Sequence, residues 1–101
     1  VLPMNEALIL ISLDISGRSY LGYDVQFPVL AVGQWDTQLL EEFLLAFTRS
    51  MGLTLHVRQL AGKNAHHIAE AVFKGLGRAL AHAVSIQTGT EDQIPSTKGL
   101  L

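Results

Sequence analysis

Alternating apolar side chains dominate the first quarter of the chain. Within residues 6–15, EALILISLDI, every second position from 9 to 15 is isoleucine or leucine, so one face of a strand would be apolar. Residues 19–27 alternate in the same way, and Gly17 supplies a permissive turn between the two segments. The pattern predicts a β-hairpin. A short edge strand is expected at 29–33, because Pro28 suits only the start or edge of a strand.

Two later segments carry helical signals. The first helix is expected to begin at Asp36 or Thr37 and to end near Ser50. A strand at 53–60 and a second helix over 64–84 are predicted to follow it. The order β-β-β-α-β-α predicts an α+β fold. We expect a two-layer α/β sandwich in which two helices cover one face of a four-stranded sheet.

The predicted helices carry more apolar surface than one small sheet can cover. Across the chain 49% of residues are hydrophobic and 16% are charged, so some apolar surface is expected to meet a partner. Gly75 and Gly77 are expected where the second helix approaches other backbone, since each destabilises a helix by about 1 kcal/mol relative to alanine. The predicted core stripes are Leu39, Leu40, Phe43 and Phe47 in the first helix and Ile68, Val72, Leu76, Ala79 and Ala83 in the second.

Composition limits the class of protein. A chain of 101 residues is a single domain, residues 1–101, and its start without methionine leads us to expect a fragment. It has no cysteine, so any transition metal must be held by imidazole and carboxylate. A net charge of -2 without a basic stripe argues against nucleic acid. We find no signal peptide and no membrane-spanning apolar run, and therefore expect a cytoplasmic protein that does not bind membranes.

Two adjacent histidines open the second predicted helix, within GKNAHHIAEAVFK at 62–74. On a helix His66 and Glu70 are one turn apart, as are His67 and Glu70, so all three gather away from the core stripe. Lys74 lies one further turn along the same side. Neutral imidazole is the form that binds metals, and the positive end of the helix dipole disfavours the protonated form. The spacing fits a metal site, and it equally fits exposed histidines beside a carboxylate.

Other polar residues are weaker candidates. Glu42 lies beside Glu41 on the first helix, where the pattern alone favours a solvated acidic pair over a metal ligand. Arg18 at the hairpin tip and the SerThrLys run at 96–98 could together bind a phosphate, and Lys74 could join them. Turns and chain ends often carry such residues without a function, so these candidates depend on the segments around them.

Those segments resemble imidazoleglycerol-phosphate dehydratase of histidine biosynthesis. They follow the family's order over essentially the whole chain: PMNEAL at 3–8, DISGRSYL at 14–21, DTQLLEEF at 36–43, TLHVRQLAGKNAHHIAEAVFKGLGRAL at 54–80 and IPSTKG at 94–99. The resemblance is to the second, C-terminal, of two similar halves of that enzyme. It implies a ribosomal protein S5 domain 2-like half-domain. It also implies that the helices of the two halves pack together, which accounts for the surplus apolar surface.

The resemblance further implies a shared metal and substrate site. In the family, two manganese ions lie where subunits meet in a 24-subunit homo-oligomeric shell, and each takes ligands from both halves. Many members have histidine at the position of Glu42, and carboxylate can replace imidazole on manganese. Carried over residue by residue, the ligands from this half are Glu42, His66, His67 and Glu70, the last three being the catalytic candidates. The matching substrate and phosphate contacts are Arg18, Lys74, Ser96 and Lys98.

The implied reaction is the removal of water from imidazole glycerol phosphate, which gives imidazole acetol phosphate. In the family the substrate imidazole binds to manganese, and the principal acid/base glutamate is expected in the first half. The family usually has aspartate near the substrate where this chain has Asn5, and an amide lacks that charge and any role as a base. We expect a lyase that is inactive without its first half. A non-catalytic assembly module and a metallohydrolase using HHxxE are the alternatives.

Overall fold

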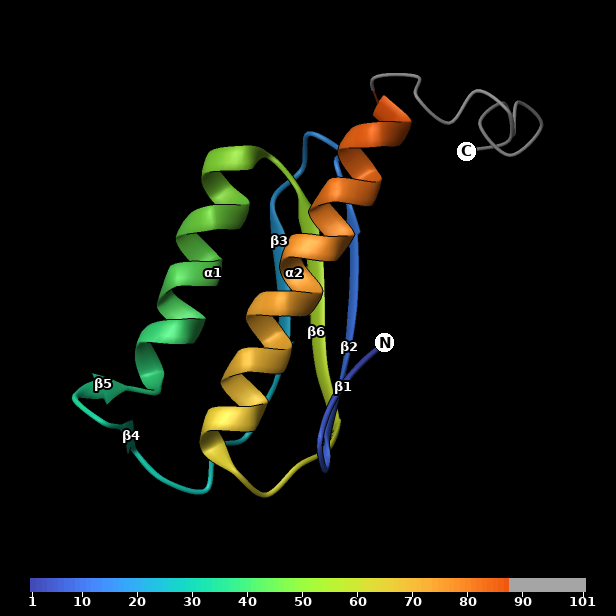
Figure 1. Ribbon diagram of the computed structural model, residues 1–101. Helices are drawn as coiled ribbons and strands as arrows, with labels where there is room; N and C mark the ends of the chain where they lie inside the picture. The colour runs from blue at the N-terminus through green and yellow to red at the C-terminus, as the bar shows by residue number, and fades with distance from the viewer. Residues whose placement is uncertain (88–101) are drawn as a thin grey trace.

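The computed structural model describes residues 1–87 and has two layers (Figure 1). Helices α1 (Gln38–Met51) and α2 (Ala65–Gln87) lie on one face of a mixed four-stranded sheet. The order of strands across this sheet is β1 (Leu2–Met4), β2 (Ala7–Asp14), β6 (Thr54–Ala61) and β3 (Tyr20–Asp24). A separate two-stranded ribbon is formed by β4 (Ala31–Val32) and β5 (Trp35–Asp36). The predicted α+β class and two-layer arrangement are confirmed.

The predicted hairpin is wrong, because β6 lies between β2 and β3. Strand β6 pairs antiparallel with β2 and parallel with β3. Its Leu55 and Val57 are fully buried, as expected of a central strand. Gly17, between β2 and β3, donates its N–H to the carbonyl of Gly52 at 2.8 Å, and so ties this turn to the start of β6. Alternation shows which face of a strand is buried, but it does not identify the neighbouring strand.

The fourth strand of the sheet is also not the predicted one. Residues 29–33 do not join the main sheet, since Ala31 and Val32 pair only with β5. The edge position is taken by β1, which pairs with β2 through a turn at Asn5 and Glu6. Asn5 has φ 52°, a left-handed conformation that asparagine tolerates better than most residues. A three-residue strand is too short to show a periodicity, so the sequence pattern could not reveal it.

The core lies between the sheet and one side of each helix. Leu40, Leu44 and Thr48 are the buried residues of α1, whereas Leu39 and Phe43 are each 48% exposed, which corrects the predicted stripe. A polar residue can be buried here because the Thr48 hydroxyl donates to the carbonyl of Leu45 at 2.9 Å. In α2 the buried stripe is confirmed for Ile68, Val72 and Leu76, while Ala79 and Ala83 are only half-buried.

Helix α2 packs closely on β2 at a single glycine. A Cβ atom at Gly75 would lie 2.9 Å from Cγ1 of Ile11, so the helix does approach β2 closely here, but the neighbour is a side chain and not the predicted backbone. At Gly77 a Cβ atom would meet nothing within 4 Å in the described part of the chain, so that prediction is wrong. Neither α1 nor α2, the helices of residues 1–87, is both long and apolar enough to cross a membrane.

Candidate metal and substrate site

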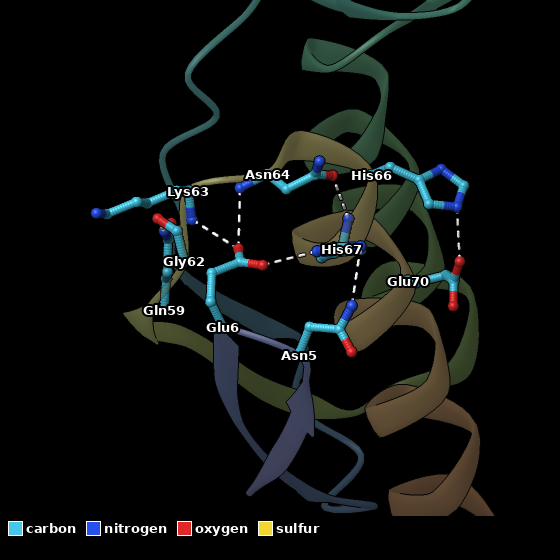
Figure 2. Close-up of polar contacts among 9 residues, drawn as sticks. All are labelled: Asn5, Glu6, Gln59, Gly62, Lys63, Asn64, His66, His67 and Glu70. Carbon is cyan, nitrogen blue, oxygen red and sulfur yellow. Dashed lines mark hydrogen bonds and ion pairs between the residues drawn. The ribbon is translucent and has the colours of Figure 1, made fainter.

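The junction between β6 and α2 is built around Gly62. Its φ of 149° and the 2.9 Å that would separate an added Cβ from Ile68 Cγ1 both require glycine. The chain therefore turns sharply and presents the N–H groups of Lys63 and Asn64 to one carboxylate. This carboxylate belongs to Glu6 in the β1–β2 turn, and its Oε2 accepts the two bonds at 2.8 and 2.9 Å (Figure 2).

The other oxygen of Glu6 holds a histidine. Glu6 Oε1 lies 2.7 Å from Nδ1 of His67, so the β1–β2 turn is joined to the first turn of α2 (Figure 2). The N–H groups of Asn64 and Lys63, and then the His67 side chain, lower the pKa of Glu6 from 4.5 to about 2. Glu6 is consequently a carboxylate over nearly the whole pH range. Asn64 also caps the helix, since its Oδ1 accepts the His67 N–H at 3.0 Å.

The second ring nitrogen of His67 faces Asn5. The distance from Asn5 Nδ2 to His67 Nε2 is 3.3 Å, and both residues belong to the same polar group at the end of the sheet (Figure 2). Sequence reasoning selected Asn5 and His67 but missed Glu6 and Asn64. Glu6 precedes His67 by 61 positions, so no local spacing could have connected them. Asn64 could have been found, since asparagine is among the favoured residues at the start of a helix.

The other two predicted ligands form a pair of their own on the outward face of α2. His66 Nε2 lies 2.6 Å from Glu70 Oε1, and the two side chains are 64% and 49% exposed. The rings of His66 and His67 are 6.4 Å apart at an angle of 65°, so they point in different directions. Among residues 1–87 no three histidine, aspartate or glutamate side chains converge as a metal would require. The predicted ligands instead form two separate groups: His66 pairs with Glu70, and His67 contacts Glu6 and Asn5.

Glu42 and Lys74 are both exposed, Glu42 on α1 and Lys74 on α2 one turn beyond Glu70. The two helices meet where Phe43 and Phe73 place their ring centroids 6.1 Å apart. Phe43 directly follows Glu42, and Phe73 follows Glu70 by three residues and directly precedes Lys74. The two helices that carry the predicted ligands are therefore in contact through Phe43 and Phe73.

Arg18 lies at the opposite end of the sheet from the histidines. Its turn is tied to Gly52, just before β6, whereas His67 follows the other end of β6 (Figure 1). A strand of eight residues spans about 25 Å. If Arg18 and His67 bind the same substrate molecule, the arginine and the histidine must therefore come from different copies of the chain. Ser96 and Lys98 lie outside the described residues.

The fold and the donors define the class of this domain: an α+β unit with imidazole and carboxylate groups exposed at one end of its sheet. The profile of the imidazoleglycerol-phosphate dehydratase family matches residues 1–80. The chain therefore belongs to the imidazoleglycerol-phosphate dehydratase family, as its sequence resemblance predicted. That match includes the Glu6, His66, His67 and Glu70 positions.

Individual relatives agree with the family match. The chain is 55% identical to the imidazoleglycerol-phosphate dehydratase of Moorella thermoacetica over 101 residues, which is 100% of this chain and 51% of the relative. It is 54% identical to the enzyme of Carboxydothermus hydrogenoformans over 99 residues, which is 98% of this chain and 50% of the relative. The crystal structure of the Staphylococcus aureus enzyme matches with a TM-score of 0.77 and 43% identity, over 78% of this chain and 46% of that one. The chain thus spans about half the length of the curated bacterial relatives that it matches.

Proposed function

We propose that this chain is the second half of a carbon–oxygen lyase of histidine biosynthesis. In this role it would take part in removing water from imidazole glycerol phosphate to give imidazole acetol phosphate. The family match and the coverage of about half of each bacterial relative support the assignment. The observation that carries it is the exposed His66–Glu70 pair beside a separately oriented His67, in a chain of this family. A cytoplasmic location remains a prediction from the sequence.

The donor set fits manganese, since imidazole nitrogen and carboxylate oxygen are both suitable ligands and the chain has no cysteine. We assign His66 and Glu70 to one ion, because His66 Nε2 and Glu70 Oε1 lie 2.6 Å apart. We assign His67 to a second ion, because its ring points in a different direction. Glu42 is proposed as the ligand contributed by α1. When bound, the ions would act as Lewis acids toward the substrate and stabilise developing negative charge.

The remaining side chains are proposed to bind and orient the substrate. Lys74 is exposed one helical turn beyond Glu70, where its ammonium group would attract the phosphate of the substrate. Arg18, Ser96 and Lys98 are proposed as further phosphate contacts. Because Arg18 lies at the far end of the sheet, we propose that it serves the site of a neighbouring subunit. This arrangement agrees with a homo-oligomeric assembly in which the sites lie between subunits.

The outward face of the helices is proposed to pack on the first half of the enzyme. Leu39 and Phe43 on α1 and Phe73 and Val84 on α2 are about half exposed in this chain. Phe73 also lies on the same side of α2 as His66 and Glu70, since residues seven and three apart share a helix face. A partner that covers these apolar side chains would also approach the metal ligands, and could supply the missing donors.

Co-expression tests this proposal. The full chain is produced alone and together with the first half of the Moorella thermoacetica relative, and each preparation is assayed for dehydration with added Mn²⁺. We expect turnover by the complex and none by the chain alone. His66→Ala serves as the loss-of-ligand variant, with His82→Ala as the matched histidine control. Appreciable turnover by the isolated chain would contradict a divided site.

One observation favours a second function, a non-catalytic assembly module. Asn5 places an amide, and not a carboxylate, 3.3 Å from the outer nitrogen of His67. A well-formed complex that binds the substrate phosphate but shows no turnover would support this function. Recovery of turnover by Asn5→Asp in the same complex would show that this single residue separates the two functions.

A further inference from the structure

Glu6 makes contacts that a surface turn residue does not need. Both of its oxygens are used, Oε2 by the N–H groups of Lys63 and Asn64, and Oε1 by His67. All three distances are 2.9 Å or less, as in charge-assisted hydrogen bonds. The carboxylate therefore sits in a fixed position between the start of α2 and one imidazole ring.

The two neighbours of His67 determine where its proton lies. A carboxylate can only accept a hydrogen bond, so Nδ1 of His67 carries the proton that it donates to Glu6 Oε1. The amide nitrogen of Asn5 can only donate, so Nε2 is the unprotonated nitrogen that accepts from it. Both contacts favour the same tautomer. Neutral imidazole binds metals through the lone pair of its unprotonated nitrogen. In His67 this is the lone pair of Nε2, which points away from Glu6.

The contacts around Glu6 and His67 hold the two side chains in position. Gly62 makes the turn that aims the N–H groups of Lys63 and Asn64 at Glu6, and Asn64 caps the turn of helix that carries His67. The contact between Asn5 Nδ2 and His67 Nε2 is the longest in this cluster, at 3.3 Å. It is the contact that a metal ion bound to Nε2 would replace. A metal would thus exchange a weak contact for a bond without disturbing Glu6.

We propose that Glu6 is a positioning residue that holds His67 in the tautomer with Nε2 free, and so orients it for the second metal ion. The inference rests on the proposed metal site. Carboxylates hydrogen-bonded to a metal-binding histidine fix its tautomer and raise its basicity, and their loss typically weakens metal binding roughly 10–100-fold. Glu6 touches neither substrate nor metal in this proposal, and it acts only through His67.

Glu6→Gln separates this role from simple capping of the helix. The glutamine carbonyl can still accept from Lys63 and Asn64, which leaves its NH₂ group facing Nδ1 of His67. Since an amide NH₂ only donates, Nδ1 must then be unprotonated and the proton moves to Nε2. The variant therefore retains the cap but favours the opposite tautomer. Asp24→Asn, at an exposed carboxylate on β3, is the matched control.

Long-range ¹H–¹⁵N spectra of the metal-free full chain at about pH 8, where imidazoles are ordinarily neutral, report the tautomer directly. We expect the Nδ1–H form of His67 in the wild type and in the control, and the Nε2–H form in Glu6→Gln. The His67 signals are assigned by their absence in His67→Asn. An Nε2–H tautomer in the wild type would overturn the proposal even if Glu6→Gln failed to fold.

The complex with a first half provides the second measurement, equilibrium binding of Mn²⁺. We expect roughly 10–100-fold weaker binding at one of two sites in Glu6→Gln, and no change in Asp24→Asn. Unchanged affinity despite an inverted tautomer would overturn the positioning role. Absence of Mn²⁺ binding in the wild-type complex would instead contradict the proposed metal site, and the spectra of the metal-free chain would still decide the tautomer.

Discussion

The two ends of the central strand β6 are built by different means. At the end that precedes α2, one carboxylate makes the contacts: Glu6 accepts hydrogen bonds from two backbone N–H groups and from the ring of His67. At the other end the main chain is held, through Gly17 to Gly52 and through the Thr54 hydroxyl to the carbonyl of Arg18. The first end presents its chemistry already oriented. The second fixes the backbone and leaves the Arg18 side chain exposed, as suits contact with another molecule.

The largest effect on stability is expected from alanine at Gly62. A Cβ there would combine an unfavourable φ with a 2.9 Å approach to Ile68, and we expect a loss of about 3 kcal/mol in the free energy of unfolding. Gly17 at the other end has φ 80° but open space around its Cβ position, so Gly17→Ala should lose only about 1 kcal/mol. Urea unfolding measures both. Equal losses would show that the two ends are equally tightly packed.

The charge of Glu6 gives the next contrast, because it makes stability depend on pH. The pKa of Glu6 is about 2 in the folded chain and 4.5 ordinarily, so its stabilising effect is complete above about pH 4.5. This effect is lost progressively as the pH falls through that range toward 2. We expect the wild type to exceed Glu6→Gln in urea midpoint at pH 6 and to match it near pH 2. A difference that stays constant from pH 6 to 2 would rule out this charge effect.

A smaller loss is expected at the opposite end from Thr54→Val. The hydroxyl of Thr54 donates to the Arg18 carbonyl at 3.1 Å, and it lies 3.2 Å from the hydroxyl of Ser16. Valine keeps the shape of the side chain without these contacts. We expect about 1 kcal/mol less stability and faster amide exchange in the β2–β3 turn. Exchange at the β6–α2 junction should not change. Loosening of both ends would mean that they are coupled through the sheet.

The smallest effect on stability is expected from Arg18→Ala. The side chain is exposed, so the free energy of unfolding should change by less than about 0.5 kcal/mol. In a complex with the first half, the same change should lower kcat/KM roughly 10–100-fold through a weaker phosphate contact. Ser19→Ala, in the same turn, is the control. A normal kcat/KM would remove Arg18 from the proposed substrate site.

The sequence was informative where the relevant contacts are local. Helical spacing correctly placed His66 beside Glu70, and apolar periodicity located both helices and three of the four strands in the main sheet. It could not place β6 between β2 and β3, because strand alternation describes a face and not a neighbour. Nor could it predict the Glu6–His67 contact, which exists only once the sheet brings the β1–β2 turn to the start of α2.

The exposed residues show a second limit of sequence patterns. Leu39 and Phe43 were predicted to belong to the core because they are apolar, but the row formed by Leu40, Leu44 and Thr48 is the buried one. The periodicity of α1 is satisfied by more than one choice of face, and only packing against β3 decides between them. The apolar residues left outside are those proposed to contact the first half.

We propose that His66 with Glu70, and His67 separately, each bind one of two metal ions in a shared site. This assignment can be tested by measuring the manganese content of the purified complex with a first half, for the wild type, His66→Ala and His67→Ala. We predict two ions per site in the wild type and one in each variant, with either ion retained when the other is lost. Loss of both ions in each variant, or tight binding of two ions by the isolated chain, would rule out two separately held ions in a shared site.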